Sequence, residues 1–234
     1  MKPLLVESED NHSLAALGLA SVQIVHDLKN QLNGLKLYAT FLRKRMEKTE
    51  RPEDELDTIR KLIAGLDRTA VDLSLISEYG SPVQIKPQPG IDLQIIMAGV
   101  ATNLNARLNA SPRTTGALAG PIIIVSEPAP LAGEFDSAVL ADALKSISSG
   151  ALKMMNNKAR DGALNIRLQD EANGTGRDGL IEWQVMDPPD HDIFHSFAGS
   201  DAIRMSLAAR IIEAHGGTAE CQGGTLRVRL PLAL

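Results

Sequence analysis

Apolar and small residues recur along the first third of the chain in alternating steps of three and four, which places them on one side of a helix. This seam comprises Leu14, Gly18, Ser21, Val25, Leu28, Leu32, Leu35, Ala39, Leu42 and Met46. A second seam begins after Pro52 and comprises Leu56, Ile59, Ile63, Leu66, Ala70, Leu73 and Ser77. The pattern predicts two long antiparallel helices over residues 13–80, with a turn at residues 49–52.

The two seams are wider than one partner helix can cover. We therefore expect the hairpin to dimerise and close as a four-helix bundle. Residues 1–12 carry no such pattern and are expected to form a flexible N-terminal arm, with Ser13 as the helix cap.

After Gly80-Ser81-Pro82 the pattern changes to short apolar runs interleaved with helical segments, which marks a domain boundary before residues 83–234. Strands are expected at residues 83–86, 122–126, 133–135, 163–169, 180–186, 218–222 and 226–230. Helices are expected at residues 92–108, 137–155 and 202–215. This order predicts an α+β protein whose second part is a two-layer α/β sandwich, with the helices on one face of a mostly antiparallel sheet.

Composition narrows the classes of function. The 234 residues are 44% apolar with a formal net charge of -5, so a packed core is expected and neither nucleic acid nor an anionic membrane is an expected partner. No segment approaches the roughly 18 uncharged apolar residues of a membrane helix. Cys221 is the single cysteine, which excludes an internal disulfide and multi-cysteine metal sites. These features predict a cytoplasmic protein.

His26 lies one place off the first seam, in a polar stripe with Gln23, Asn30 and Asn33, and should face solvent. Spacing alone is typical of an ordinary surface histidine. Asp27 beside it could hold one ring nitrogen protonated and leave the other as a nucleophile toward a phosphoryl group. Asn30, one turn further on, could orient a water or a phosphoryl oxygen.

The run His26-Asp27-Leu28-Lys29-Asn30-Gln31-Leu32, lying on such a seam, resembles the phosphoacceptor box of two-component histidine kinases. The resemblance implies that His26 is the phosphorylated residue and Asp27 the neighbouring acid or base. It implies that Asn30 assists dephosphorylation of a partner. Gln31 fits a second kinase subfamily, in which an acid and three residues precede a glutamine.

The order of elements over residues 83–234 is similar to the ATP-binding domain shared by histidine kinases, gyrases and the heat-shock chaperone family. Ser206–Gly217 resembles the helix and turn that follow the second glycine box of the kinases. Asp192–Phe197 resembles the phenylalanine-bearing segment before that box. The resemblance implies the fold of a nucleotide-binding domain.

This sequence departs from the kinase pattern at the magnesium position. The pattern requires an asparagine immediately before Ala-x-Lys, and Gly150 stands there, before Ala151-Leu152-Lys153. The asparagine one turn earlier is replaced by Ser146. Magnesium beside nucleotide phosphates requires oxygen ligands, which glycine lacks and a lone serine supplies poorly. We expect no metal.

Both glycine boxes are also altered. Asp187, at the position that meets the adenine amine in the family, is followed by Pro188-Pro189 rather than glycines. Ala202-Ile203-Arg204-Met205 stands where phosphates would approach a glycine-rich backbone. Gly150 and Asp187 are therefore expected to be vestigial, and no cofactor is expected. The acidic and histidine residues at 190–195 fit no metal site, and His215 is expected to be a helix C-terminal residue rather than a ligand.

The leading hypothesis is a histidine phosphotransfer protein that carries a phosphoryl group on His26 between receiver-domain aspartates of response regulators, without ATP. The first alternative is an active histidine kinase with a divergent ATP site. The second is a non-enzymatic scaffold or phosphatase that binds a response regulator, in which Asn30 or Gln31 would act on the partner.

Overall fold

The computed structural model describes residues 4–48, 51–110, 121–126, 129–156, 163–174, 176–185, 192–196 and 199–233. The side chains of residues 4–22, 110 and 156 lie outside this description. The chain forms two compact units, Met1–Pro82 and Val83–Leu234, and each is considered by itself.

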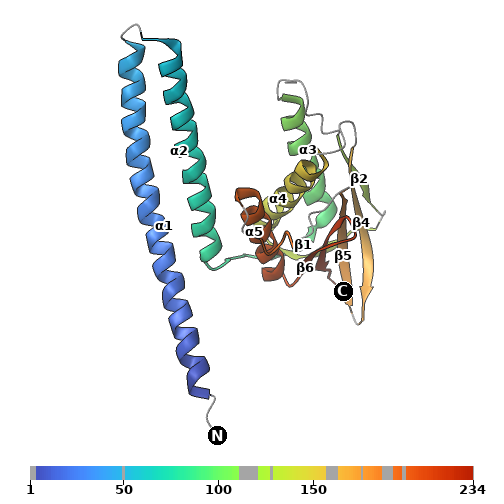
Figure 1. Cartoon of the computed structure of the whole chain (residues 1–234). Helices are drawn as coiled ribbons and strands as arrows, with labels where there is room; N and C mark the ends of the chain where they lie inside the picture. The colour runs from blue at the N-terminus through green and yellow to red at the C-terminus, as the bar shows by residue number, and fades with distance from the viewer. Residues whose placement is uncertain are drawn as a thin grey trace. The chain divides into compact units, whose positions relative to one another are not determined.

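The first unit is the predicted helical hairpin, in which α1 (Leu4–Glu47) and α2 (Glu53–Gly80) run antiparallel (Figure 1). Pro52 precedes α2, and the acidic residues of its first turn suit the positive end of the helix dipole. The structure corrects the predicted arm, because α1 begins at Leu4 rather than at Ser13. No proline or glycine stands in residues 4–17, so the sequence has no residue that would strongly break a helix there.

Contacts between the two helices follow the predicted seam of α1. Ala39 is buried, and Val25, Leu32 and Met46 are half-buried on the same side. An ion pair between Lys36 Nζ and Asp67 Oδ1 (2.6 Å) links α1 to α2 beside this seam. Each of the two side chains is still about half exposed, so this pair adds little stability to the hairpin.

The second unit has two layers, with α3, α4 and α5 on one side of a five-stranded sheet (Figure 1). Its elements are β1 (Gln88–Asp92), α3 (Leu93–Ala110), β2 (Ile122–Ser126), β3 (Ala132–Phe135), α4 (Ser137–Asn156), β4 (Leu164–Asn173), β5 (Gly176–Gln184), α5 (Ser200–Ala214), β6 (Thr218–Gln222) and β7 (Thr225–Pro231). The sheet order is β2-β4-β5-β7-β6, and only the β2–β4 pairing is parallel. The predicted α+β class and the helices of this unit are confirmed.

One predicted strand is wrong. Residues 83–86 alternate apolar and polar but form no strand; β1 begins at Gln88 and pairs with β3 in a separate two-stranded sheet. The backbone N–H of Lys86 donates to the Asp136 carboxylate (2.8 Å) instead of to a neighbouring strand, and Pro87 has no N–H to offer. Local alternation cannot reveal this side-chain partner.

The core lies between the helices and the sheet and is mostly aliphatic, with Trp183, Phe135 and Phe194 as its largest members. The Trp183 indole N–H donates to Ser148 Oγ (2.9 Å), whose hydroxyl donates to the Leu144 carbonyl (2.8 Å). The polar atoms of these two buried side chains are therefore paired, as burial requires.

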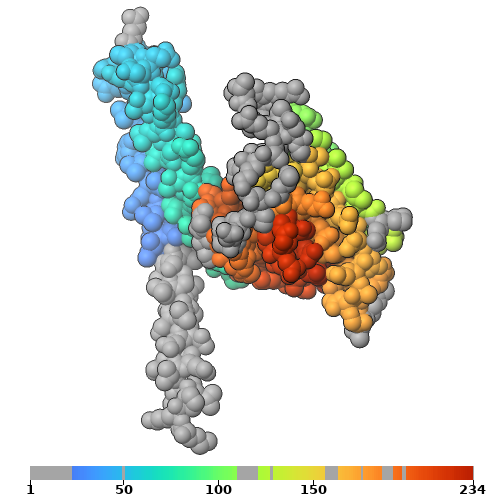
Figure 2. All heavy atoms as spheres, turned by 45° about the vertical axis from the view of Figure 1, so that its right-hand side comes forward, coloured from blue at the N-terminus to red at the C-terminus, as the bar shows by residue number. Residues whose placement is uncertain are grey.

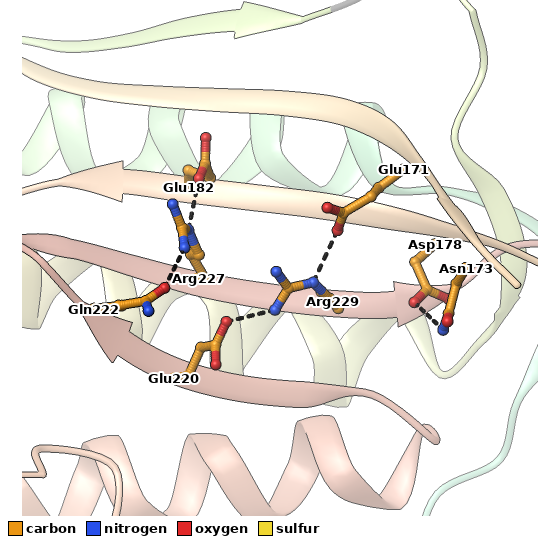
Figure 3. Close-up of polar contacts among 8 residues, drawn as sticks. All are labelled: Glu171, Asn173, Asp178, Glu182, Glu220, Gln222, Arg227 and Arg229. Carbon is orange, nitrogen blue, oxygen red and sulfur yellow. Dashed lines mark hydrogen bonds and ion pairs between the residues drawn. The ribbon is translucent and has the colours of Figure 1, made fainter.

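The outer face of the sheet is polar, and atoms of β4 to β7, coloured orange to red, form part of the molecular surface in Figure 2. Arg227 and Arg229, both on β7, pair with acidic or amide side chains of other strands (Figure 3). Arg227 reaches the two adjacent strands, β5 and β6, whereas Arg229 reaches β6 and, across β5, β4. These pairs are Arg227–Glu182 (2.8 Å), Arg227–Gln222 (2.7 Å), Arg229–Glu171 (2.8 Å) and Arg229–Glu220 (2.5 Å). The two carboxylates raise the pKa of the Arg229 guanidinium above its ordinary value. This face is thus a solvated surface stabilised by cross-strand pairs.

Candidate functional site

His26 stands on an exposed flank of α1. Its side chain is 62% exposed, as the polar stripe in the sequence predicts. Nδ1 of the ring lies 3.4 Å from Asn30 Nδ2 in hydrogen-bond geometry and 3.5 Å from Asp27 Oδ1. Within the described part of the chain, Nε2 has no polar partner. Because the side chain is exposed and Nδ1 is occupied, Nε2 is the nitrogen available to a second protein.

Asp27 also forms a hydrogen bond with Gln23. The Gln23 side-chain amide donates to Asp27 Oδ1 (3.1 Å), the same oxygen that faces His26. The structure therefore brings together four polar side chains within two turns of α1, Asn30 being the fourth. The sequence places Gln23 in the polar stripe without indicating a role for it, although its four-residue spacing from Asp27 is typical of a helix-surface pair.

Gln31 lies apart from this cluster. It follows His26 by five residues, which turns it about 140° around a helix of 3.6 residues per turn. Its neighbours at helical spacing are Leu28 and Leu35, which are 42% and 54% exposed. Gln31 therefore belongs to a different flank of α1.

That flank is apolar. Leu28, Leu35 and Leu42 follow one another at seven-residue intervals. Ile24, one turn before Leu28, and Tyr38, between Leu35 and Leu42, lie on the same side, and all five are exposed in the single chain. We call these five residues the apolar flank. A continuous row of exposed apolar side chains of this kind is typical of an interaction surface.

In the second unit, the position of the kinase asparagine is closely packed. Gly150 lies in α4, and a Cβ built there would come 2.7 Å from Met205 Sδ. Met205 is 2% exposed, so its side chain occupies the space beside Gly150 from α5. One turn earlier, the Ser146 hydroxyl donates to the Asp142 carbonyl of its own helix (2.9 Å).

One further contact joins α4 to α5, and another joins α5 to the segment that precedes α5. Lys153 Nζ pairs with Asp201 Oδ1 (2.5 Å), and Ser206 Oγ donates to the Ser196 carbonyl (2.9 Å). Gly199 has a positive φ of 96°, and α5 begins at the next residue, so residues 202–205 are helical rather than a phosphate-binding loop. Arg204 on this helix is exposed.

Asp187 lies outside the described residues. Further along the chain, His195 Nδ1 is 2.7 Å from Asp192 Oδ2, and Phe194 N–H donates to Asp192 Oδ1 (3.0 Å). Burial raises the pKa of Asp192, but these hydrogen bonds outweigh it and leave the pKa below its ordinary value. Among the residues whose placement is described, no cluster of three histidine, cysteine or acidic side chains could hold a metal.

His215 at the end of α5 has a structural role. Its Nε2 accepts the Asp136 backbone N–H (3.1 Å), so Nδ1 carries the proton and donates to the Ile211 carbonyl (2.8 Å). The Asp136 carboxylate accepts backbone N–H groups, chiefly from Lys86 and then from Val139, and these bonds lower its pKa. Both nitrogens of His215 are therefore engaged by backbone, as expected for a residue that is not a ligand.

A scan against protein-family models and a search of curated proteins found no match. Solved structures do match. Full-length ShkA, crystallised in complex with AMPPNP, aligns over 92% of this chain with a TM-score of 0.63 and 16% identity, and the chain spans 46% of ShkA. The histidine kinase AdeS of Acinetobacter baumannii aligns over 89% of this chain and 97% of its own, with a TM-score of 0.50 and 16% identity.

These similarities extend over both units of the chain, because each alignment covers about nine-tenths of it. At 16% identity they concern the fold and not the activity. In the described part of the chain, no helix combines the length and apolar character needed to cross a membrane. The chain has a histidine-kinase-like fold.

Proposed function

We propose that the chain is a histidine phosphotransfer protein of two-component signalling, in which His26 accepts a phosphoryl group from one receiver-domain aspartate and returns it to another. The observation that carries this proposal is the exposed His26 ring, whose Nδ1 faces Asp27 and Asn30 while Nε2 has no polar partner among the described residues. A phosphoryl group on the receiver is already activated, so transfer needs positioning of the nucleophile more than a nucleotide site.

In the transfer step, the lone pair of Nε2 attacks phosphorus while the bond from phosphorus to the aspartate oxygen breaks. The aspartate leaves as a carboxylate, and the imidazole keeps a proton on Nδ1, where Asp27 can accept it. Transfer to the second receiver reverses these steps. Asn30 is not required for forward transfer, because its amide is neither a base nor a nucleophile.

The packing of α4 against α5 supports a role without ATP. The site of the magnesium-binding asparagine is a glycine against which Met205 packs, and Lys153 is paired with Asp201. A nucleotide with its metal would have to displace these contacts and would find no side-chain amide at residue 150. We therefore propose that residues 83–234 keep the ATPase-like fold without its cofactor.

The apolar flank of α1 supports a dimer. Leu28, Leu35 and Leu42 are exposed in a single chain, and a second hairpin packed on this flank would bury them in a four-helix bundle. We propose that residues 13–80 form both the dimerisation surface and the phosphoacceptor site. The residues of α1 before residue 13 continue the same helix. The partner is the receiver domain of a response regulator.

The test is incubation of the purified chain with labelled phospho-receiver and, separately, with labelled ATP. Label reaching the chain from the receiver, and not in a His26→Gln variant, supports phosphotransfer. A glutamine on this exposed helical position should leave the fold intact, which circular dichroism would check. Label from ATP would instead select the divergent kinase, and no label from either source would select the scaffold.

A further inference from the structure

Two side chains compete for Nδ1 of His26. The Asn30 amide nitrogen lies 3.4 Å from it and can only donate, which requires a lone pair on Nδ1. Asp27 Oδ1 lies 3.5 Å from it and can only accept, which requires a proton on Nδ1. A neutral imidazole satisfies one or the other, and the two arrangements are its two tautomers.

Gln23 biases this competition. Its amide donates to Asp27 Oδ1 at 3.1 Å, a shorter contact than the one from the same oxygen to His26. Asp27 lies at ion-pair distance from His26 without a hydrogen bond to it, whereas Asn30 meets hydrogen-bond geometry. Because a carboxylate oxygen has lone pairs for more than one donor, Gln23 acts by holding the orientation of the Asp27 carboxylate rather than by occupying it. All of these side chains are on one helix, so their spacing holds without any partner.

We infer that Gln23 is a positioning residue that keeps Asp27 from accepting the His26 Nδ1 proton, so that Asn30 holds the free protein in the Nε2–H tautomer. The effect of this tautomer on phosphoryl transfer rests on the proposed function. With a proton on Nε2, the exposed nitrogen has no lone pair for attack on phosphorus. The proton must first move, through solvent, from Nε2 to Nδ1, where Asp27 replaces Asn30 as the partner.

The resting protein is thus a poor phosphoacceptor until the Gln23–Asp27 contact opens. A receiver domain that inserts beside His26 and draws the Gln23 amide away would release Asp27 and generate the reactive tautomer. The rate gained by removing Gln23 is limited by the population of that tautomer in the free protein. If it is about 10%, the gain is at most about tenfold.

The experiment is nitrogen-15 NMR of the histidine rings in the full chain, at alkaline pH where imidazoles are neutral, with His26 assigned by comparison with His26→Gln. Wild type should show His26 protonated on Nε2. His215, whose Nδ1–H is fixed by backbone groups, serves as the internal reference for the other tautomer. Gln23→Ala and Asn30→Ala should each move His26 toward Nδ1–H. Asn33→Ala, an exposed amide two turns away, should not.

An Nδ1–H tautomer in wild type would overturn the inference. It would mean that the Nδ1 proton is accepted either by the side-chain oxygen of Asn30 or by the Asp27 carboxylate. An unchanged tautomer in Gln23→Ala would overturn it as well. The tautomer is read without any phosphoryl donor, so the outcome is separate from the proposed function. If the tautomers are as expected but no label passes from the receiver to the chain, the phosphotransfer role alone is refuted. If label is transferred but the tautomer of His26 does not change in the variants, this inference alone is refuted.

Discussion

Replacing Gly150 by alanine tests whether Met205 fills the space beside α4. The added Cβ would lie 2.7 Å from Met205 Sδ, well inside the roughly 3.5–4.0 Å of an ordinary carbon contact. Because Met205 is 2% exposed, it can yield only by disturbing its neighbours, and such overpacking costs about 1–3 kcal/mol. Alanine also improves the helix by about 1 kcal/mol over glycine. The net change should be from about zero to 2 kcal/mol of destabilisation.

Gly99 provides the matched control. It lies inside helix α3, and a Cβ there meets nothing within 4 Å, so Gly99→Ala should show the gain in helix propensity alone. The difference in unfolding free energy between the two variants, about 1–3 kcal/mol, isolates the contact with Met205. Urea unfolding followed by the fluorescence of Trp183, the single tryptophan, reports on this unit. If Gly150→Ala were as stabilising as Gly99→Ala, the packed site would be refuted.

Three further results are expected. Leu35→Asp should dissociate the proposed dimer in sedimentation because it would bury an unpaired charge, whereas Leu37→Asp, equally exposed at 54% but on the His26 side, should not. Ser148→Ala leaves the buried indole N–H unpaired and should cost about 1–3 kcal/mol in urea unfolding, while Ser146→Ala on the same helix should cost little. The lowered pKa of Asp136 stabilises the fold above the ordinary carboxyl pKa of about 4, and this contribution disappears as pH falls through the folded-state value. The difference in melting temperature between wild type and Asp136→Asn should therefore shrink on acidification; a constant difference would contradict this origin.

The spacing of apolar residues was sufficient to predict the helices that pack through a regular apolar seam. The seams predicted both helices of the hairpin, and the same pattern places His26 off the buried side, where its ring is exposed. The same spacing did not predict the start of α1, which was expected at Ser13, and it wrongly predicted a strand at residues 83–86. In the first case a helix continues because nothing in the local sequence stops it. In the second, an alternating run that looks like a strand donates to the Asp136 side chain, fifty residues away in sequence.

Features of the site that depend on contacts across the fold were beyond sequence reasoning. Gly150 stands where the kinase pattern has an asparagine, but its contact with Met205 depends on how α4 and α5 pack. Conversely, the Gln23–Asp27 contact is local and could have been found from its four-residue spacing. Spacing does not reveal that Asn30 and Asp27 approach the same nitrogen, because that depends on side-chain rotamers.

Helix geometry separates the two surfaces proposed for α1. His26 and Leu35 are nine residues apart, which at 3.6 residues per turn places them about 180° apart around the helix. A second hairpin packed on the apolar flank would therefore leave His26 of both chains open to solvent, and a receiver could approach without disturbing the dimer. If the two surfaces are independent, a Leu35→Asp monomer that remains folded should still accept label at His26. Loss of labelling in such a folded monomer would mean that the second chain contributes to the phosphoacceptor site.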